Sequence, residues 1–257
     1  MPQLNNFKIQ NNFNKSAQHY DLYTQLHRDI ADKVCSRLMR EEMPTAILDV
    51  GCGTGYLTRK LKDLMPQVEI VGLDFAQGML EVARLKREDI FWVLGDCKKI
   101  GLTDQSFDWV VSNLAYQWSD DLTEAFSEAR RVLNSKGIFA CTLFGYKTCQ
   151  ELFQSLNEAK GHDLNFSRLP QESSVRELLA KCDFKNVDIH TQVMKMEFKD
   201  IYALLNWLKS IGANNISRIG FIGTDLLRKA DLIFQDKFSY LQGVGVSFEV
   251  IYVYAKK

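Results

Sequence analysis

The sequence has no surplus of either charge, because lysine plus arginine and aspartate plus glutamate each number 32 in 257 residues. A strong electrostatic attraction to nucleic acid or to an anionic membrane surface is therefore not expected. No run approaches the roughly 20 apolar residues of a membrane-spanning helix, and the start, MPQLNNFKIQ, lacks the basic-then-apolar pattern of a signal peptide. We expect a cytoplasmic protein with no nucleic-acid or membrane partner.

The six cysteines are scattered, with no CxxC pair and no neighbouring histidine cluster. This spacing is not typical of a zinc site or of a disulfide framework, so we expect buried, reduced thiols and no metal. No repeat, low-complexity tract or proline- or glycine-rich linker divides the chain. The length then favours one domain with an insertion.

Short apolar runs alternate with helical patterns through the first 144 residues. The runs predicted as strands are 45–50, 68–73, 90–94, 107–112 and 137–144. Helical spacing follows the first two of them, at 56–64 and around 79–83, and recurs at 122–133. Strands that alternate with helices predict a parallel sheet with right-handed crossovers.

The two ends of the chain add helices and further strands. Residues from about 14 to 42 read as one or two helices, with Ser16 as the predicted N-cap. After residue 147 the pattern is mostly helical, with one strand candidate at 187–196 and a last strand at 246–254 that we expect to pair antiparallel. We predict a doubly wound, mostly parallel seven-stranded α/β sheet. Its parts are residues 1–146 as N-terminal helices and α/β core, 147–240 as a helical cap with one core strand, and 241–257 as the final strand.

A glycine-rich turn, DVGCGTG at 49–55, follows the first predicted strand. Alone it is a weak signal, since any tight strand-to-helix turn favours glycine. The second predicted strand ends at Asp74, whose carboxylate can accept hydrogen bonds from a ribose diol, and the third ends at Asp96. Acids at three successive strand ends face the crevice where open α/β sheets bind ligands.

Two adenosine-containing cofactors fit this pattern. The dinucleotide fingerprint reads GxGxxG, but here the third glycine, Gly55, comes one residue earlier. Asp49 precedes the turn, where a carboxylate would repel a pyrophosphate but could receive an amino group. S-adenosylmethionine carries an amine and a sulfonium and no phosphate. We therefore expect S-adenosylmethionine, with an NAD-binding enzyme as the alternative.

Longer stretches carry a family resemblance. ILDVGCGTGYLTRKL, VGLDFAQGMLEVA and EARRVLNSKGIFACTLF resemble class I S-adenosylmethionine-dependent methyltransferases. NNFNKSAQHYDLYTQLHRDIADKV, SNLAYQW and LKSIGANN are similar to the malonyl-acyl-carrier-protein O-methyltransferase family, and the first 155 residues match best. The resemblance implies methyl transfer to the free carboxylate of malonyl-acyl carrier protein, or of malonyl-CoA, as the first step of biotin synthesis.

The same resemblance implies the site residues. Those that would bind the cofactor are Asp49, Gly51, Gly53, Gly55, Asp74, Phe75, Met79, Asp96, Cys97, Asn113 and Leu114. Tyr20 would close over the cofactor and face the acceptor, with Tyr116, Gln117 and Trp118 as the opposite wall. Core packing is the alternative for each of these aromatic side chains.

A malonyl half-acid is ionised at neutral pH, so its carboxylate can attack a sulfonium methyl group without a general base. In agreement, no histidine has an obvious catalytic partner, and a surface or capping role is expected for each. A forked arginine should orient the carboxylate, and the candidates in the cap are Arg168, Arg176 and Arg218. An acidic carrier protein would need a basic docking face, yet residues 151–240 hold 12 basic and 12 acidic residues.

Two other function classes remain open at this point. A class I methyltransferase could act on another small molecule, such as a quinone precursor, which a cap without an arginine near the sulfonium would favour. A non-catalytic protein could bind S-adenosylmethionine or a partner, which a blocked acceptor pocket would favour.

Overall fold

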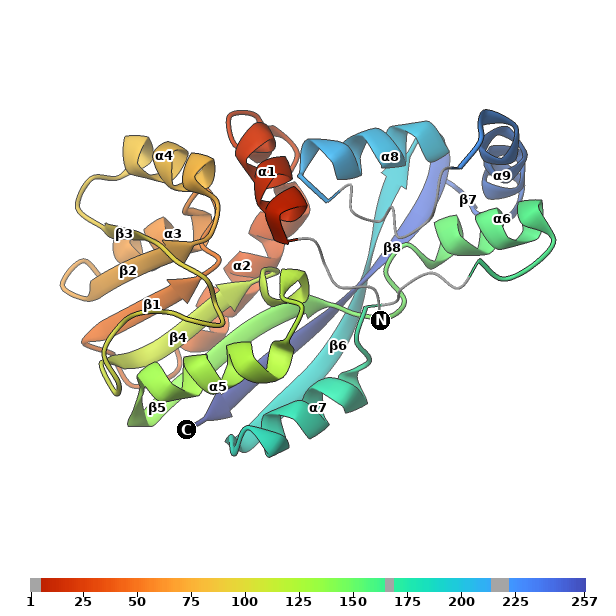
Figure 1. The fold of residues 1–257 in the computed structure, drawn as a ribbon. Helices are drawn as coiled ribbons and strands as arrows, with labels where there is room; N and C mark the ends of the chain where they lie inside the picture. The colour runs from red at the N-terminus through yellow and green to blue at the C-terminus, as the bar shows by residue number, and fades with distance from the viewer. Residues whose placement is uncertain (1–5, 165–168, 214–221) are drawn as a thin grey trace.

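The computed structural model describes residues 6–164, 169–213 and 222–257 (Figure 1). One sheet of eight strands runs through it in the order β3-β2-β1-β4-β5-β8-β6, and the short β7 pairs with β8. The strands are β1 (Ala46–Val50), β2 (Glu69–Asp74), β3 (Phe91–Leu94), β4 (Phe107–Asn113), β5 (Leu133–Phe144), β6 (Lys185–Phe198), β7 (Ser239–Tyr240) and β8 (Gly243–Lys256).

Strands β1 to β5 pair in parallel, whereas β8 pairs antiparallel with β5 and with β6. The predicted doubly wound, mostly parallel sheet with an antiparallel last strand is confirmed. The two-residue β7 is an addition to the seven predicted strands. Nearly every residue of β8 is buried because the strand lies between two neighbours and is covered on both faces, which explains its continuous apolar run.

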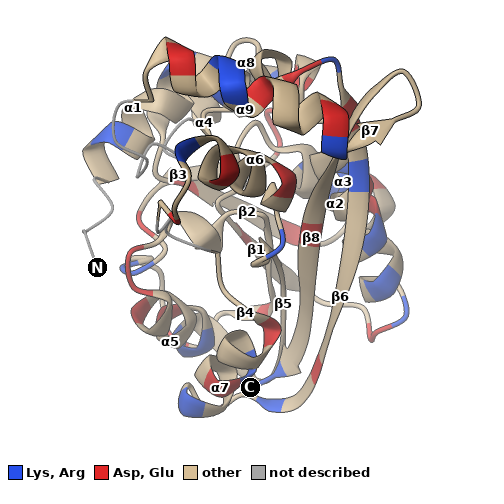
Figure 2. Cartoon of the chain, turned by 90° about the vertical axis from the view of Figure 1, so that its right-hand side faces the viewer, with Lys and Arg blue, Asp and Glu red and all other residues tan. Residues whose placement is uncertain are grey.

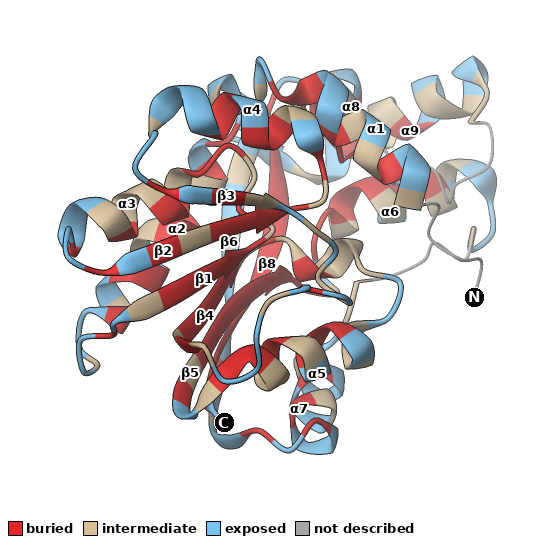
Figure 3. Ribbon diagram, turned by 60° about the vertical axis from the view of Figure 1, so that its left-hand side comes forward, coloured by how far each residue is buried: buried red, intermediate tan, exposed pale blue. Residues whose placement is uncertain are grey.

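Helices cover both faces of the sheet (Figures 1 and 3). They are α1 (Asn6–Ser16), α2 (Gln25–Leu38), α3 (Tyr56–Leu64), α4 (Gln77–Lys86), α5 (Leu122–Val132), α6 (Gln150–Lys160), α7 (Glu172–Lys181), α8 (Ile201–Ser210) and α9 (Thr224–Lys237). Two short 3-10 helices, η1 (Tyr20–Leu22) and η2 (Tyr116–Trp118), lie in loops. The apolar faces of α2 and α3 pack on one side of the sheet, and those of α5 and α7 pack on the other.

Helices α6, α8 and α9 lie beyond the upper ends of β6 and β8, in the region predicted as a cap (Figure 1). Glu151 of α6 anchors this region, because its buried carboxylate accepts hydrogen bonds from the backbone N–H (2.9 Å) and hydroxyl (2.5 Å) of Ser247 in β8. Trp207 of α8 donates its indole N–H to the Tyr23 carbonyl (2.8 Å). The cap therefore contacts the N-terminal segment that is predicted to close over the cofactor.

The N-terminal region departs from the prediction. Ser16 does not cap a helix N-terminus; it ends α1, and its hydroxyl donates to the Phe13 carbonyl (3.2 Å). The following helix, α2, begins only at Gln25 after Thr24 as its N-cap. The sequence pattern missed α1 because only Ile9 and Phe13 bury apolar side chains in an otherwise polar stretch, so its stability depends on tertiary packing.

Candidate functional site

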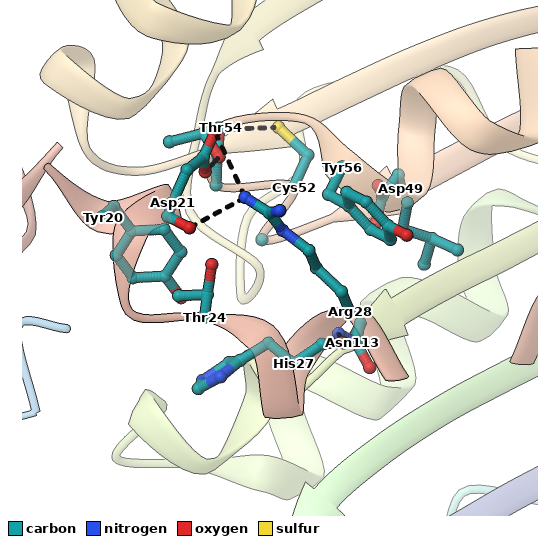
Figure 4. Close-up of a pocket in the computed structure, with 13 residues that line it drawn as sticks. Tyr20, Asp21, Thr24, His27, Arg28, Asp49, Cys52, Thr54, Tyr56 and Asn113 are labelled. Atoms are coloured by element: carbon teal, nitrogen blue, oxygen red, sulfur yellow. Dashed lines mark hydrogen bonds and ion pairs between the residues drawn. The ribbon is translucent and has the colours of Figure 1, made fainter. Parts of the chain in front are cut away.

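The candidate site lies at the carboxyl ends of β1 and β4, neighbouring strands between which the order of the sheet reverses. Open α/β sheets bind ligands at such a point because the chain leaves the two strands in opposite directions. A pocket opens there (Figure 4). Its walls come from the N-terminal segment 20–28, the glycine-turn segment 49–57 and Asn113.

The glycine turn approaches its neighbours closely. Gly51 has φ +70°, and a Cβ atom added there would lie 2.2 Å from the Ala115 Cβ. Gly55 has φ +80°, and an added Cβ would lie 2.5 Å from the Trp92 ring. Both positions require glycine, since side chains are disfavoured at positive φ and have no room here. The turn is therefore packed tightly against Ala115 and Trp92.

Asp49 is the buried acid of the pocket, with 1% of its surface exposed. One carboxylate oxygen accepts a hydrogen bond from the Thr58 hydroxyl (2.6 Å), and the other, Oδ1, has no partner among the described residues. Burial raises the pKa of Asp49 to about 7, and the charge of Asp74 adds to the rise. A buried oxygen without a partner is costly. The site consequently fits a cationic ligand group such as the amino group of S-adenosylmethionine.

Asp74 lies beside the glycine turn at the end of β2. Its carboxylate oxygens accept hydrogen bonds from the backbone N–H groups of Gly53 (2.8 Å) and Ala76 (2.8 Å). Burial raises the pKa of Asp74 to about 6, although these hydrogen bonds act in the opposite direction. Each carboxylate oxygen can accept more than one hydrogen bond, so the group retains capacity for ribose hydroxyls.

The residues predicted near the adenine lie apart from this pocket. Phe75 and Met79 share an apolar cluster with Phe13 of α1, whose ring centroid is 6.1 Å from that of Phe75. Asp96 is exposed and accepts a hydrogen bond from the Lys98 backbone N–H (2.8 Å). Cys97 beside it is partly buried, and burial raises the pKa of its thiol to about 12. The cofactor role of this second group remains a prediction.

Asn113 connects β4 to the N-terminal segment. Its side-chain NH₂ donates to the His27 carbonyl (2.9 Å), and its oxygen accepts from the Thr142 hydroxyl (2.9 Å). Leu114 follows with φ +54°, an unusual value that turns the chain sharply at the end of the strand. Of these two predicted cofactor residues, Asn113 lines the pocket.

The two tyrosines predicted to contact the substrate have different surroundings. Tyr20 lines the pocket, and burial together with the charge of Asp74 raises the pKa of its hydroxyl, so the hydroxyl stays protonated. Tyr116 is turned into the core on the α5 side, where its ring contacts Phe126 (5.2 Å) and Phe139 (5.8 Å). The core-packing alternative therefore describes Tyr116.

The predicted arginines are not found at the pocket. Arg168 and Arg218 lie outside the described residues. Arg176 is exposed on α7, pairs with Glu172 (2.9 Å) and does not line the pocket. Arg176 is separated from the site because α7 packs on a face of the sheet, whereas the site lies at the ends of the strands.

The sequence reasoning missed several residues that line the pocket, among them His27 and Arg28. His27 is partly buried rather than on the surface. Burial lowers the pKa of His27 to about 4, and its Nδ1 has no partner among the described residues. A signal was present, because Thr24, His27 and Arg28 have i, i+3, i+4 spacing and so share one face of a helix.

Asp21 fixes the N-terminal segment over the pocket. It accepts a hydrogen bond from the Thr54 hydroxyl (2.6 Å), pairs with Lys86 of α4 and lies 4.0 Å from Arg28. Burial would raise the pKa of Asp21, but these partners prevail and hold it below its ordinary value. The carboxylate thus connects three separate elements of the molecule.

Replacing Asp21 by asparagine should lower the free energy of unfolding by about 1–2 kcal/mol at pH 7, because the charge-assisted contacts are lost. Since the pKa is lower in the folded state, this contribution is present at neutral pH and disappears as the pH falls through that pKa. Urea denaturation at pH 7 and pH 3 measures both effects. Asp29→Asn is the control, because the hydrogen bond of Asp29 within the described residues is to the exposed Gln25 side chain (2.7 Å). Equal losses in the two variants would contradict the role of Asp21.

The described residues contain no group of three or more histidine, cysteine, aspartate or glutamate side chains arranged to hold a metal ion. The six cysteines are free, and five of them are buried. Within the same ranges, none of the helices combines the length and apolarity needed to span a membrane.

The sequence matches known methyltransferases. The model of a family described as "Methyltransferase domain" matches residues 48–141. A malonyl-[acyl-carrier protein] O-methyltransferase of Geobacter sulfurreducens is 33% identical over 97% of this chain and 98% of its own length. The biotin biosynthesis bifunctional protein BioHC of Teredinibacter turnerae is 29% identical over 97% of this chain and 46% of its own length.

Solved structures share the fold. The YcgJ protein of Bacillus subtilis matches with a TM-score of 0.63 and 17% identity, over 88% of this chain and 98% of that one. The phosphoethanolamine N-methyltransferase 2 of Haemonchus contortus, in complex with phosphomonomethylethanolamine and S-adenosylhomocysteine, matches with a TM-score of 0.56 and 18% identity, over 88% and 52%. The predicted fold class is confirmed, and by its full-length similarity the chain belongs to the malonyl-[acyl-carrier protein] O-methyltransferase family.

Proposed function

We propose that this protein transfers a methyl group from S-adenosylmethionine to the free carboxylate of a malonyl group on an acyl carrier protein, giving the methyl ester that starts biotin synthesis. Full-length similarity to a protein of that name supports the acceptor. The observation that carries the cofactor is the unpartnered Asp49 oxygen beside the glycine turn, at the switch point of the sheet.

When bound, S-adenosylmethionine supplies an electrophilic methyl group on a positively charged sulfur. Asp49 would hold its amino group, and Asp74 would hold the ribose hydroxyls. Gly51 and Gly55 let the turn pack closely against neighbouring side chains, because neither position has room for a side chain of its own. Asp49 in the pocket and the neighbouring Asp74 at the end of β2 are therefore chemically suited to the cofactor.

The ionisable groups of the pocket fit a reaction without a general base. A carboxylic acid with an ordinary pKa of about 4 is ionised at neutral pH, so the acceptor already carries its nucleophilic oxygen. His27 is neutral at that pH and a very weak base, since burial lowers its pKa to about 4. The Tyr20 hydroxyl keeps its proton and can donate a hydrogen bond. The protein has to orient the acceptor rather than activate it.

Aromatic rings gather around His27 at the pocket. The His27 ring lies 6.1 Å from that of Tyr20, 5.9 Å from that of Phe144 and 6.4 Å from that of Trp207, measured between centroids. As the bond from the carboxylate oxygen to the methyl carbon forms, the bond from that carbon to sulfur breaks, and both charges disappear. A dry site favours that change, and proximity can supply up to about 7–11 kcal/mol.

The distribution of charged residues does not identify a docking face for the carrier protein. Figure 2 shows basic and acidic residues intermixed on α6 and α9. Lys237 of α9, for example, pairs with Glu158 of α6 (2.6 Å). Within the described residues these two helices form no uniformly basic surface, in agreement with the balanced composition of the region.

Intact-mass spectrometry of malonyl-loaded carrier protein, incubated with the purified protein and S-adenosylmethionine, tests the proposal. The malonyl form should gain one methylene unit, whereas an acetyl-loaded carrier should gain none because it lacks a free carboxylate. Malonyl-CoA in a parallel reaction distinguishes the two acyl carriers. S-adenosylhomocysteine added in excess should suppress the gain.

The opposite result would redirect the assignment. If calorimetry shows S-adenosylmethionine binding but the malonyl form gains no mass, the acceptor is a different molecule and the proposal is wrong. Quinone precursors would then be the next acceptors to assay.

A further inference from the structure

We propose that His27 contacts the methyl acceptor, as a neutral hydrogen-bond donor to the carboxylate oxygen that does not attack. This contact would hold the carboxylate with its other oxygen directed at the sulfonium methyl group. The inference rests on the proposed function and deepens it, because it names a residue that orients the acceptor.

The backbone of His27 is fixed at the edge of the sheet. His27 lies in the first turn of α2, and its carbonyl accepts a hydrogen bond from the side-chain NH₂ of Asn113 (2.9 Å). The side-chain oxygen of Asn113 accepts in turn from the Thr142 hydroxyl (2.9 Å). These bonds connect the start of α2 to β4 and β5 near their carboxyl ends. His27 therefore has a defined place where an open α/β sheet binds its ligand.

The His27 ring lies on the cap side of the pocket. Figure 4 shows that His27 and Arg28 extend in different directions, and Arg28 extends toward Tyr56, whose ring centre lies 5.4 Å from the guanidinium carbon. The His27 ring instead contacts Phe144 at the end of β5 (5.9 Å) and Trp207 of the cap helix α8 (6.4 Å). The ring is therefore placed between the pocket and the cap, where an acceptor can approach without displacing the cofactor.

The Nδ1 atom of His27 is available for a ligand. It is buried and has no hydrogen-bond partner among the described residues, which is costly unless a ligand supplies one. The nearby Trp207 indole N–H is already donated to the Tyr23 carbonyl (2.8 Å). A neutral imidazole carries one N–H, which can be placed on either nitrogen. Nδ1 can therefore donate to an oxygen of the acceptor.

A neutral donor suits this reaction. Burial lowers the pKa of His27 to about 4, so the ring carries no charge at neutral pH. During transfer the attacking oxygen gives an electron pair to the methyl carbon, the carbon–sulfur pair returns to sulfur, and S-adenosylhomocysteine leaves; no proton moves. A cation beside the carboxylate would stabilise the charged acceptor more than the transition state, in which that charge is falling. His27 can orient the carboxylate without this penalty.

Two variants separate the hydrogen bond from ring packing. His27→Phe keeps an aromatic ring and removes the nitrogen, so kcat/KM for malonyl-loaded carrier protein should fall about 10- to 100-fold, as expected for a hydrogen bond to a charged group. Its Tm should be unchanged or higher, because a buried unpaired nitrogen is removed. His27→Asn loses the ring but places an amide N–H donor near the position of Nδ1. It should retain more activity than His27→Phe, whereas a packing role predicts the reverse order.

Initial rates from intact-mass spectrometry give kcat/KM, and calorimetry should show an unchanged affinity of both variants for S-adenosylmethionine. His190→Phe is the matched control. His190 is exposed on β6 and its ring also stacks on an aromatic side chain, that of Tyr252 (5.1 Å). It lies outside the pocket, so its replacement should change neither the rate nor the affinity.

Each contrary outcome is distinguishable. If His27→Phe keeps the wild-type kcat/KM, or if His27→Asn is the more impaired of the two, the ring acts through packing and the inference is wrong. A loss of S-adenosylmethionine affinity as large as the loss of kcat/KM would assign His27 to the cofactor and also overturn the inference. If the wild-type protein binds S-adenosylmethionine but does not methylate the malonyl form, the proposed function is wrong, and the inference that rests on it is wrong as well.

Discussion

Replacing Gly51 by alanine is expected to lower the free energy of unfolding by about 2–5 kcal/mol and to remove cofactor binding. The backbone there has φ +70°, which costs a residue with a side chain about 1–2 kcal/mol. The new methyl group would lie 2.2 Å from the Ala115 Cβ, and relieving such a contact in a packed region costs about 1–3 kcal/mol more. Equilibrium urea denaturation measures the loss, and calorimetry measures cofactor affinity.

Gly53 provides the control for the clash. Its φ is +56°, but an added Cβ would meet no atom within 4 Å, so Gly53→Ala should lose only the backbone part, about 1–2 kcal/mol. The double variant Gly51→Ala/Ala115→Gly should recover the steric part and keep the backbone part. If Gly51→Ala and Gly53→Ala are equally destabilised, the close approach to Ala115 does not govern the turn.

The elements of the α/β core could be predicted because local and global signals agree there. The predicted helix at 56–64 coincides with α3, since a glycine turn precedes it and apolar residues recur at helical period. The antiparallel final strand was also correct, because a continuous apolar run at the chain end fits a covered position in the sheet. Helix α1 could not be predicted in this way, because its two buried apolar side chains give too weak a local pattern.

The site could be predicted where backbone connectivity determines position. Asp49 and Asp74 end adjacent parallel strands, so the sheet itself brings them together at one edge. The spacing of Thr24, His27 and Arg28 puts them on one helix face, but that face lines the pocket of Asp49 only because α2 begins beside the glycine turn, which is a tertiary arrangement. The orientation of Tyr116 could not be predicted for a related reason. The sequence of its short loop does not indicate whether the ring points toward the site or into the core.

Replacing Asp49 by asparagine is expected to stabilise the protein without ligand while weakening cofactor binding. Burial raises the pKa of Asp49 to about 7 in the folded state, above the value of about 3.9 in an unfolded chain. The folded state therefore holds its proton more tightly, and the group's contribution to stability is lost as the pH rises through about 7. At pH 8 the asparagine variant should gain about 2 kcal/mol, or several degrees in Tm, and the gain should shrink toward pH 5.

Cofactor binding should change in the opposite direction. The ammonium group needs an ionised partner, so the affinity of the wild-type protein for S-adenosylmethionine should rise between pH 6 and pH 8, whereas Asp49→Asn should lose that dependence and bind about 10- to 100-fold more weakly at pH 8. Calorimetry across that pH range, with thermal unfolding of the same samples, measures both effects.

Asp108, on the adjacent β4, is the matched control because its carboxylate is already satisfied by Thr45 (2.6 Å to the hydroxyl) and Asn134 (2.7 Å). Although burial opposes them, these hydrogen bonds hold its pKa below the ordinary value, so Asp108→Asn should destabilise the protein at pH 8. If both variants shift stability in the same direction, the ionised Asp49 does not destabilise the protein without ligand, and the prediction is wrong. Opposite shifts, with affinity lost only in Asp49→Asn, would show that stability is sacrificed at this one carboxylate for cofactor binding.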